Sequence, residues 1–196
     1  MKYFLITLGI FLIGIIAFLS SIKSSYNNLV TLQTSAQTKK AQVETELQRR
    51  WDLINQMVGS TKGALRHEEA IFDNIAKQQA AFINAQKQGD TQGELNASNQ
   101  VSGAVGQLFR SYLVVQSQYP NEQALEFVRN LQVDIEGSEN RISVARQRYN
   151  ERVQEYNQAR RTFPTVIIAG FMNFQDMQFY AADASSQKAP GVNLEK

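Results

Sequence analysis

The pair His67-Glu68 is where this sequence comes nearest to a catalytic metal motif. The zinc-protease motif HExxH needs a second His one helical turn later, but position 71 is Ile. The chain has one His and no Cys, which also excludes zinc sites built from three or four Cys and His ligands. No second acid or nucleophile accompanies His67 at helical spacing. We therefore interpret His67 as an interhelix hydrogen-bonding residue rather than a general base, and Glu68 as part of a solvated face.

The sequence Arg49-Arg50-Trp51-Asp52 could bind an anion such as a lipid phosphate, because guanidinium groups match phosphate geometry. Glu46 and Asp52 lie close enough along a helix to neutralise the two arginines, whereas an exposed phosphate site should show uncompensated Arg. We favour an ion-pair network here, and anion binding is the alternative.

Tyrosines and asparagines recur beside apolar positions late in the chain. Tyr149-Asn150 and Tyr156-Asn157 are one heptad apart, so they share one stripe of a helix. A tyrosine stripe is usually core, with its hydroxyls reaching water or a partner. Asn in a coiled-coil core costs stability but fixes register and oligomeric state, so we interpret Asn140, Asn150 and Asn157 as interface residues. Simple surface polarity is the alternative.

The remaining sequence argues against catalysis and nucleic-acid binding. It has no nucleophile elbow, P-loop or dinucleotide fingerprint, so we predict no catalytic residues, cofactor, metal or small-molecule substrate, and no enzyme. Lys and Arg number 20 against 18 Asp and Glu. Because Lys2 and Lys23 flank the apolar N-terminal segment, the rest of the chain is balanced, which disfavours nucleic acid as a partner.

The elements that must position these residues begin with a membrane anchor. The segment 3–22 is uncharged and would span about 30 Å as a helix, the thickness of a bilayer's hydrocarbon core. A cleaved signal peptide is the rival reading, but Leu19 stands where the cleavage site needs a small residue. We predict an uncleaved, single-pass membrane anchor over 1–23. Lys2 and the free amine against Lys23 favour an extracytoplasmic soluble domain.

Apolar residues at spacings of three, four and seven predict an all-α fold, an antiparallel helical bundle with coiled-coil character. The expected helices cover about 24–85, 94–118, 122–162 and 165–180, within a bundle domain over 24–183. A bend is expected near Gly59, and Tyr119-Pro120 should reverse the chain because the residue before Pro avoids the α region. The polar tail 184–196 is expected to be disordered.

Several motifs in this order and spacing resemble the LemA family of bacterial membrane-anchored helical proteins. The resemblance covers roughly residues 1 to 175. It implies a single-pass anchor in the bacterial inner membrane, a helical bundle and no established enzymatic activity. The sequence departs from the family pattern at Asn55, where Pro is usual. The matching residues are 26–30 (YNNLV), 47–54 (LQRRWDLI), His67-Glu68, Tyr119-Pro120, Glu139-Asn140-Arg141-Ile142, Arg146, Tyr149-Asn150, Tyr156-Asn157 and Phe163-Pro164.

These features predict a non-enzymatic, membrane-anchored scaffold that contacts lipid, self-associates and organises or remodels the bilayer. The alternative is a sensor or signalling stalk that passes a signal to a partner protein. Self-association is expected because a 24–85 helix would outrun its antiparallel partner and leave Leu29, Val43, Leu47 and Ile54 uncovered. Such a stalk should pack against copies of itself.

Overall fold

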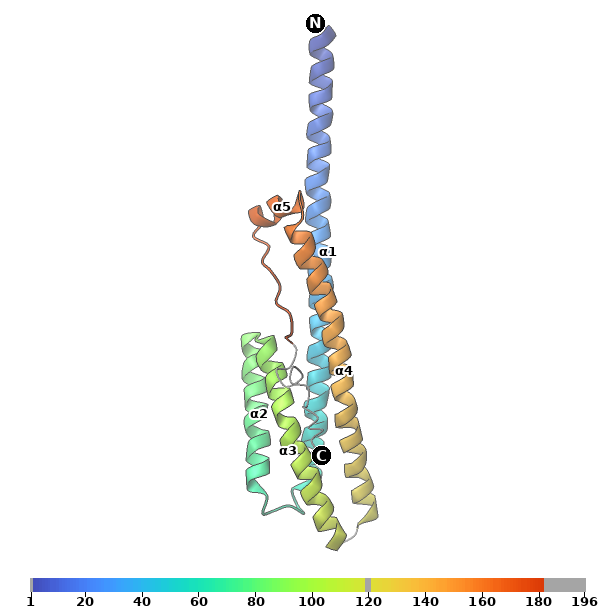
Figure 1. Ribbon diagram of the computed structural model, residues 1–196, viewed down its shortest axis with the longest axis vertical. Coiled ribbons are helices and arrows are strands. Elements are labelled where there is room, and N and C mark those ends of the chain that lie inside the picture. The colour runs from blue at the N-terminus through green and yellow to red at the C-terminus, as the bar shows by residue number, and fades with distance from the viewer. Residues whose placement is uncertain (1, 119–120, 182–196) are drawn as a thin grey trace, which may run out of the picture. The chain divides into compact units, whose positions relative to one another are not determined.

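The protein's computed structural model describes residues 2–118 and 121–181 (Figure 1). It contains five helices: α1 (Lys2–Thr61), α2 (Glu69–Gln88), α3 (Thr91–Gln118), α4 (Glu122–Arg161) and α5 (Thr165–Phe171). The described residues contain no strand, which confirms the predicted all-α class. Tyr119-Pro120 and the tail 184–196 lie outside the described residues.

The predicted helix 24–85 is wrong as a single element, because α1 ends at Thr61 and α2 begins at Glu69. Helix α1 continues through Gly59, where a bend was expected, and ends two residues later at Thr61. In the connection, the Leu65 amide donates to the Thr61 carbonyl at 3.0 Å, and the Leu65 side chain is buried. Leu65 thus preserves the apolar pattern across a turn, and this is why periodicity alone does not reveal the break.

The apolar N-terminal segment and the first helix of the bundle form one continuous helix. The stretch at its beginning is long and apolar enough to cross a membrane, and its side chains are exposed. The large exposed apolar side chains in this stretch are Ile10, Phe11, Leu12, Ile13, Ile15, Ile16, Phe18 and Leu19.

The predicted helix 165–180 is also too long, because α5 ends at Phe171. Asn173 adopts a positive φ of 55°, and the chain continues without regular secondary structure to residue 181. Side chains of α4 bind the backbone of this segment in place of helical hydrogen bonds, as described below.

The chain divides into two compact units. The anchor unit comprises residues 1–43 with 144–179, and the bundle unit comprises residues 44–143 with 180–196. Both α1 and α4 contribute to each unit.

The bundle unit buries apolar residues from all four of the helices that contribute to it. The rings of Trp51 in α1 and Phe82 in α2 pack with centroids 5.6 Å apart. Gly89, with a φ of 67°, ends α2 in the left-handed conformation that glycine tolerates best, and Asp90 caps α3 by accepting the Gly93 amide at 2.9 Å. Figure 1 shows α2 and α3 as the resulting antiparallel pair. Further core residues are Leu47, Ile54, Met57, Ile75, Leu95, Val101, Leu108, Val128, Leu131 and Ile135.

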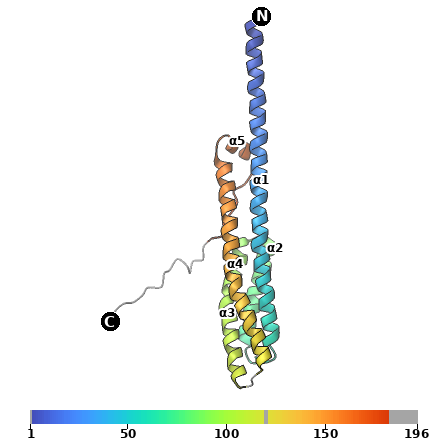
Figure 2. The same ribbon diagram turned by 90° about the vertical axis from the view of Figure 1, so that its right-hand side faces the viewer.

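The anchor unit is smaller and is built where α1, α4 and α5 meet (Figure 2). Leu29, Tyr156 and Ala169 form its buried centre, and Leu32, Ala159, Phe174 and Met177 pack around them. The ring of Tyr26 meets the ring of Phe174 edge-on at 5.9 Å. Each of the three helices supplies one side of this small core.

The structure contradicts the prediction that α1 carries an uncovered apolar stalk. Leu29, Val43, Leu47 and Ile54 are all 0% exposed within a single chain. They are covered because the chain turns back after Thr61, and because α4 and α5 supply side chains such as Tyr156 and Ala169 against Leu29. Any self-association must therefore use another surface.

Candidate functional site

The first polar cluster surrounds Arg50 inside the bundle unit. The Arg50 guanidinium is 2% exposed and joins three helices. Its Nη1 donates to Ser98 Oγ at 3.2 Å, and its Nη2 donates to Ser102 Oγ and to Glu139 Oε1, each at 2.7 Å. Ser102 also donates to Glu139 at 3.2 Å. The cluster is therefore a cross-link between α1, α3 and α4.

Electrostatics explain why Arg50 needs these partners. Burial lowers the pKa of Arg50, and the charge and hydrogen bond of Glu139 oppose that shift. A buried guanidinium is tolerated when a counter-charge and additional acceptors replace water. The Glu139 side chain is half exposed, so the pair reaches solvent on one side only. This geometry encloses the charge and leaves it poorly placed for binding a lipid phosphate.

The partners of the arginine motif differ from those expected. Glu46 accepts a hydrogen bond from Arg141 Nε at 3.3 Å, and Asp52 accepts one from Gln48 at 3.1 Å. Arg49 is exposed, on a different side of α1 from Arg50. Neighbours in sequence therefore do not neutralise Arg50, because adjacent helical residues point in different directions and α3 and α4 supply its acceptors.

The serines of this cluster were not anticipated, although the sequence carries a signal for them. Glu94, Ser98 and Ser102 are spaced by four residues and so line one face of α3. Glu94 and Ser98 are buried. Polar residues at core spacing on an otherwise apolar helix face indicate a buried polar partner. For Ser98 and Ser102 this partner is Arg50.

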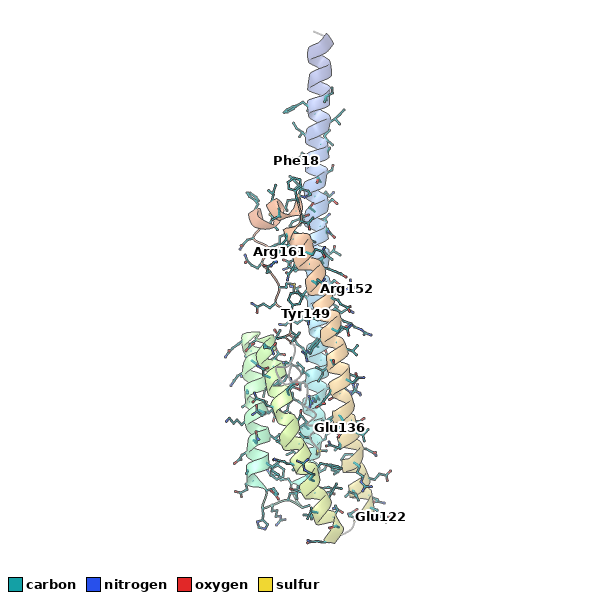
Figure 3. All side chains as sticks on the ribbon, in the orientation of Figure 1. Phe18, Glu122, Glu136, Tyr149, Arg152 and Arg161 are labelled. Atoms are coloured by element: carbon teal, nitrogen blue, oxygen red, sulfur yellow. The ribbon has the colours of Figure 1, made fainter. Side chains whose placement is uncertain are left out.

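The second polar cluster lies in the anchor unit, where residues 173–178, the return segment, run back along α4. The Tyr149 hydroxyl donates to the Gln178 carbonyl at 2.7 Å, and the Tyr156 hydroxyl donates to the Gln175 carbonyl at 2.9 Å. Burial raises the pKa of Tyr156, which keeps its hydroxyl a neutral donor. Figure 3 shows Tyr149 and Arg161 on the side of α4 that faces the return segment.

Asn157 makes the most specific contact with the return segment. Its Nδ2 donates to the Met177 carbonyl at 2.8 Å, and its Oδ1 accepts the Met177 amide at 3.0 Å. A side-chain amide thus pairs with both polar groups of one peptide residue, as a neighbouring strand would. We expected Asn157 to specify an interface between chains, but here it binds the backbone of its own chain.

The polar end of the same stripe is formed by two arginines. Arg160 donates through Nε to the Phe174 carbonyl at 2.7 Å and pairs with Asp176 at 2.7 Å. Arg161 pairs with the other Asp176 oxygen at 2.8 Å. Hydrogen bonding from Arg161 lowers the pKa of Asp176, although burial acts in the opposite direction.

This shift predicts an acid-sensitive return segment. Because folding lowers the pKa of Asp176, the stabilising contribution is complete above the ordinary Asp pKa of about 4 and is lost as pH falls through the lower folded value. Amide exchange around Asp176 should therefore accelerate below about pH 4, beyond the intrinsic pH dependence of exchange. Asp176→Asn should remove this additional step. An unchanged step in the variant would contradict the assignment to Asp176.

The other sequence-predicted residues do not converge on one site. His67 is exposed in the connection between α1 and α2, so it does not bridge helices as expected, and Glu68 is half-buried at the start of α2. Asn140 is exposed. Arg146, Asn150 and Pro164 are partly buried, and Phe163 is 76% exposed. Among the described residues, no group of three or more His, Asp or Glu side chains could hold a metal ion.

These features define a helical protein with one helix apolar enough to cross a membrane, a packed bundle, and polar clusters that connect its own helices. The chain belongs to the LemA family, whose family model matches residues 39–194. It is also similar to three curated magnetosome proteins. MamQ of Magnetospirillum gryphiswaldense is 23% identical over 88% of this chain and 71% of its own length. MamQ 1 and MamQ 2 of Paramagnetospirillum magneticum are each 22% identical over 86% of this chain and 69% of theirs.

Family, relatives and the apolar helix together indicate a membrane-associated helical protein. The family match begins at residue 39 and includes both polar clusters.

Proposed function

We propose that this protein is a non-enzymatic, membrane-anchored scaffold that self-associates and organises or remodels the bacterial membrane. The observation that carries the proposal is the direct continuation of an exposed apolar helix into a bundle with a complete core of its own. The relatives named as magnetosome proteins support the bacterial setting. The Arg50 cluster and the return segment supply rigidity, which a scaffold needs.

Self-association is assigned in this proposal to the membrane-spanning part of α1. The apolar residues of the proximal helix are covered within one chain, whereas Ile10, Ile13 and Phe18 each remain about two-thirds exposed. In a bilayer, helices associate through close packing of complementary faces, and small residues such as Gly14 permit close approach. Tethering also raises the local concentration of copies.

Single-cysteine cross-linking in native membranes tests this assignment, because the chain has no Cys. Cysteines placed singly at residues 10–19 should form intermolecular disulfides with a helical repeat of about 3.5 residues, since only one face meets the partner. Glu126→Cys on an exposed part of α4 is the control and should cross-link weakly. Uniformly absent anchor cross-links, with a monomeric mass in mild detergent, would refute self-association. Disulfides between anchors that form only when another membrane protein is present would favour the alternative, a sensor stalk that acts on a partner protein.

Remodelling and orientation need separate measurements. Full-length protein reconstituted into vesicles should change their shape in electron micrographs at high protein density, and unchanged vesicles would count against remodelling. Alkaline phosphatase fused after Lys196 should be active in cells if the bundle is extracytoplasmic, as we propose. An inactive, stably produced fusion would place the bundle on the cytoplasmic side.

A further inference from the structure

The α5 region exposes apolar side chains that the core of the anchor unit leaves uncovered. Phe163 is 76% exposed, Ile167 63% and Phe171 87%. Val166 and Met172 are about half exposed. No residue from Thr162 to Gln175 carries a charge. Exposed large apolar residues grouped in this way usually mark a binding surface.

The opposite side of α5 fixes this orientation. Ile168 and Ala169 are buried, and Ala169 packs against Leu29 of α1 and Tyr156 of α4. The Phe174 amide donates to the Ala169 carbonyl at 2.9 Å, which connects α5 to the return segment that Asn157 and Arg160 bind. The short helix therefore cannot turn its exposed apolar side chains inward without losing a packed face.

The position of α5 along α1 coincides with the expected edge of the bilayer. Leu29, its contact on α1, lies six residues after Lys23, or about 9 Å along the helix axis. Tyr26, which meets Phe174, is nearer still. Figure 3 labels Phe18 on α1 just beyond the end of α5, on the apolar side of Lys23. All these residues belong to the anchor unit.

We propose that Phe163–Met172 is a second membrane contact, in which Phe163, Ile167 and Phe171 insert into the headgroup and upper acyl region beside the anchor. This rests on the proposed function, because α1 must first cross the bilayer. Interfacial helices bury their apolar side about 5–10 Å into this boundary, so the apolar side chains of α5 need to reach it from a level about 9 Å beyond Lys23 along α1. The contact ties the ends of α4 and α5 to the membrane surface and so fixes the anchor unit against it.

The lipid bilayer is a better occupant than a second protein chain for two reasons. In the proposed function the bilayer already covers the exposed apolar stretch of α1, and the contacts of the α5 region on α1, Tyr26 and Leu29, follow Lys23 by only three and six residues. The segment itself has no charge that insertion would desolvate. The nearest charges on either side of it, Arg161 and Asp176, pair with each other. Insertion therefore requires no buried unpaired charge.

The absence of native Cys allows a direct test with single cysteines carrying an environment-sensitive nitrobenzoxadiazole dye in full-length protein in phosphatidylcholine–phosphatidylglycerol vesicles. Phe171→Cys reports on α5, Phe18→Cys reports on the anchor, and Gln178→Cys is the exposed control on the return segment. Nitroxide lipids labelled at a shallow or a deep acyl position quench each dye by contact.

The expected result is blue-shifted emission from the dye at position 171 with stronger quenching by the shallow nitroxide, blue-shifted emission at position 18, and water-like emission at position 178. Water-like emission at position 171 with a membrane-embedded dye at position 18 would overturn the α5 contact and leave the anchor intact. Blue-shifted emission at position 171 without quenching by either nitroxide would mean that protein, such as a second copy, covers α5, and would also overturn it. Water-like emission at position 18 would refute the anchor and the α5 contact together.

Discussion

Replacing Arg50 with Ala should lower the free energy of unfolding by about 2–4 kcal/mol, because it truncates a large buried side chain and removes the hydrogen-bond partner of a buried hydroxyl. The substitution removes three hydrogen bonds and leaves the fully buried Ser98 hydroxyl without the guanidinium. It also leaves a cavity between α1, α3 and α4. Glu139 contributes less to the loss, because its half-exposed carboxylate can be hydrated.

The measurement is urea unfolding of the full-length protein in detergent, followed by the fluorescence of Trp51, the single Trp, which is buried in the same bundle unit. Arg49→Ala removes an exposed neighbour and should change stability by no more than about 0.5 kcal/mol. Arg50→Met keeps much of the volume without the charge and should cost less than Ala. Equal stabilities for Arg49→Ala and Arg50→Ala would show that the cluster does not hold the bundle together.

Replacing Asn157 with Ala should free the return segment from α4 and cost about 1–3 kcal/mol. Two hydrogen bonds to one backbone residue are lost, and the Met177 amide and carbonyl must find water instead. Because the loss is local, amide exchange at Met177 should accelerate by roughly 10- to 100-fold while exchange in the bundle unit stays unchanged.

Two matched variants sharpen this prediction. Asn157→Asp keeps an acceptor for the Met177 amide but cannot donate to the Met177 carbonyl, so it should lose part of the protection. Gln158→Ala changes an exposed neighbour on the same helix and should leave exchange at Met177 as it is. If Gln158→Ala accelerates exchange as much as Asn157→Ala, the effect belongs to helix α4 and not to the amide pair.

Much of the helical architecture follows from local patterns in the sequence. The spacing of apolar residues predicts the ends of α4 to within one residue, and α3 ends at Gln118 as expected. The same spacing places Tyr149 and Tyr156 in the core, where both are buried. Periodicity fails at residues 62–68 because buried Leu65 continues the apolar pattern through a turn.

The polar clusters were harder to predict, because their partners come from distant elements. Arg50 and Glu139 are 89 residues apart, so no spacing rule along one helix connects them. The acceptors for the hydroxyls of Tyr149 and Tyr156 and for Nε of Arg160 are backbone carbonyls, which every residue carries and which leave no mark in the sequence. The sequence supplies the donors on one stripe of α4 but not what they bind.

The sequence by itself determined the helical class, the uncharged stretch that can cross a membrane, and the stripe that joins Tyr149, Tyr156 and Asn157. These properties depend on hydropathy and on the helical repeat, which act over a few neighbouring residues. Only the tertiary structure decided that the chain covers its own stalk, that Asn157 binds Met177 and that α5 keeps Phe163 and Phe171 exposed. The reason is physical: whether an apolar face is covered depends on which distant segments return to it, and that is settled by the packing of the whole chain.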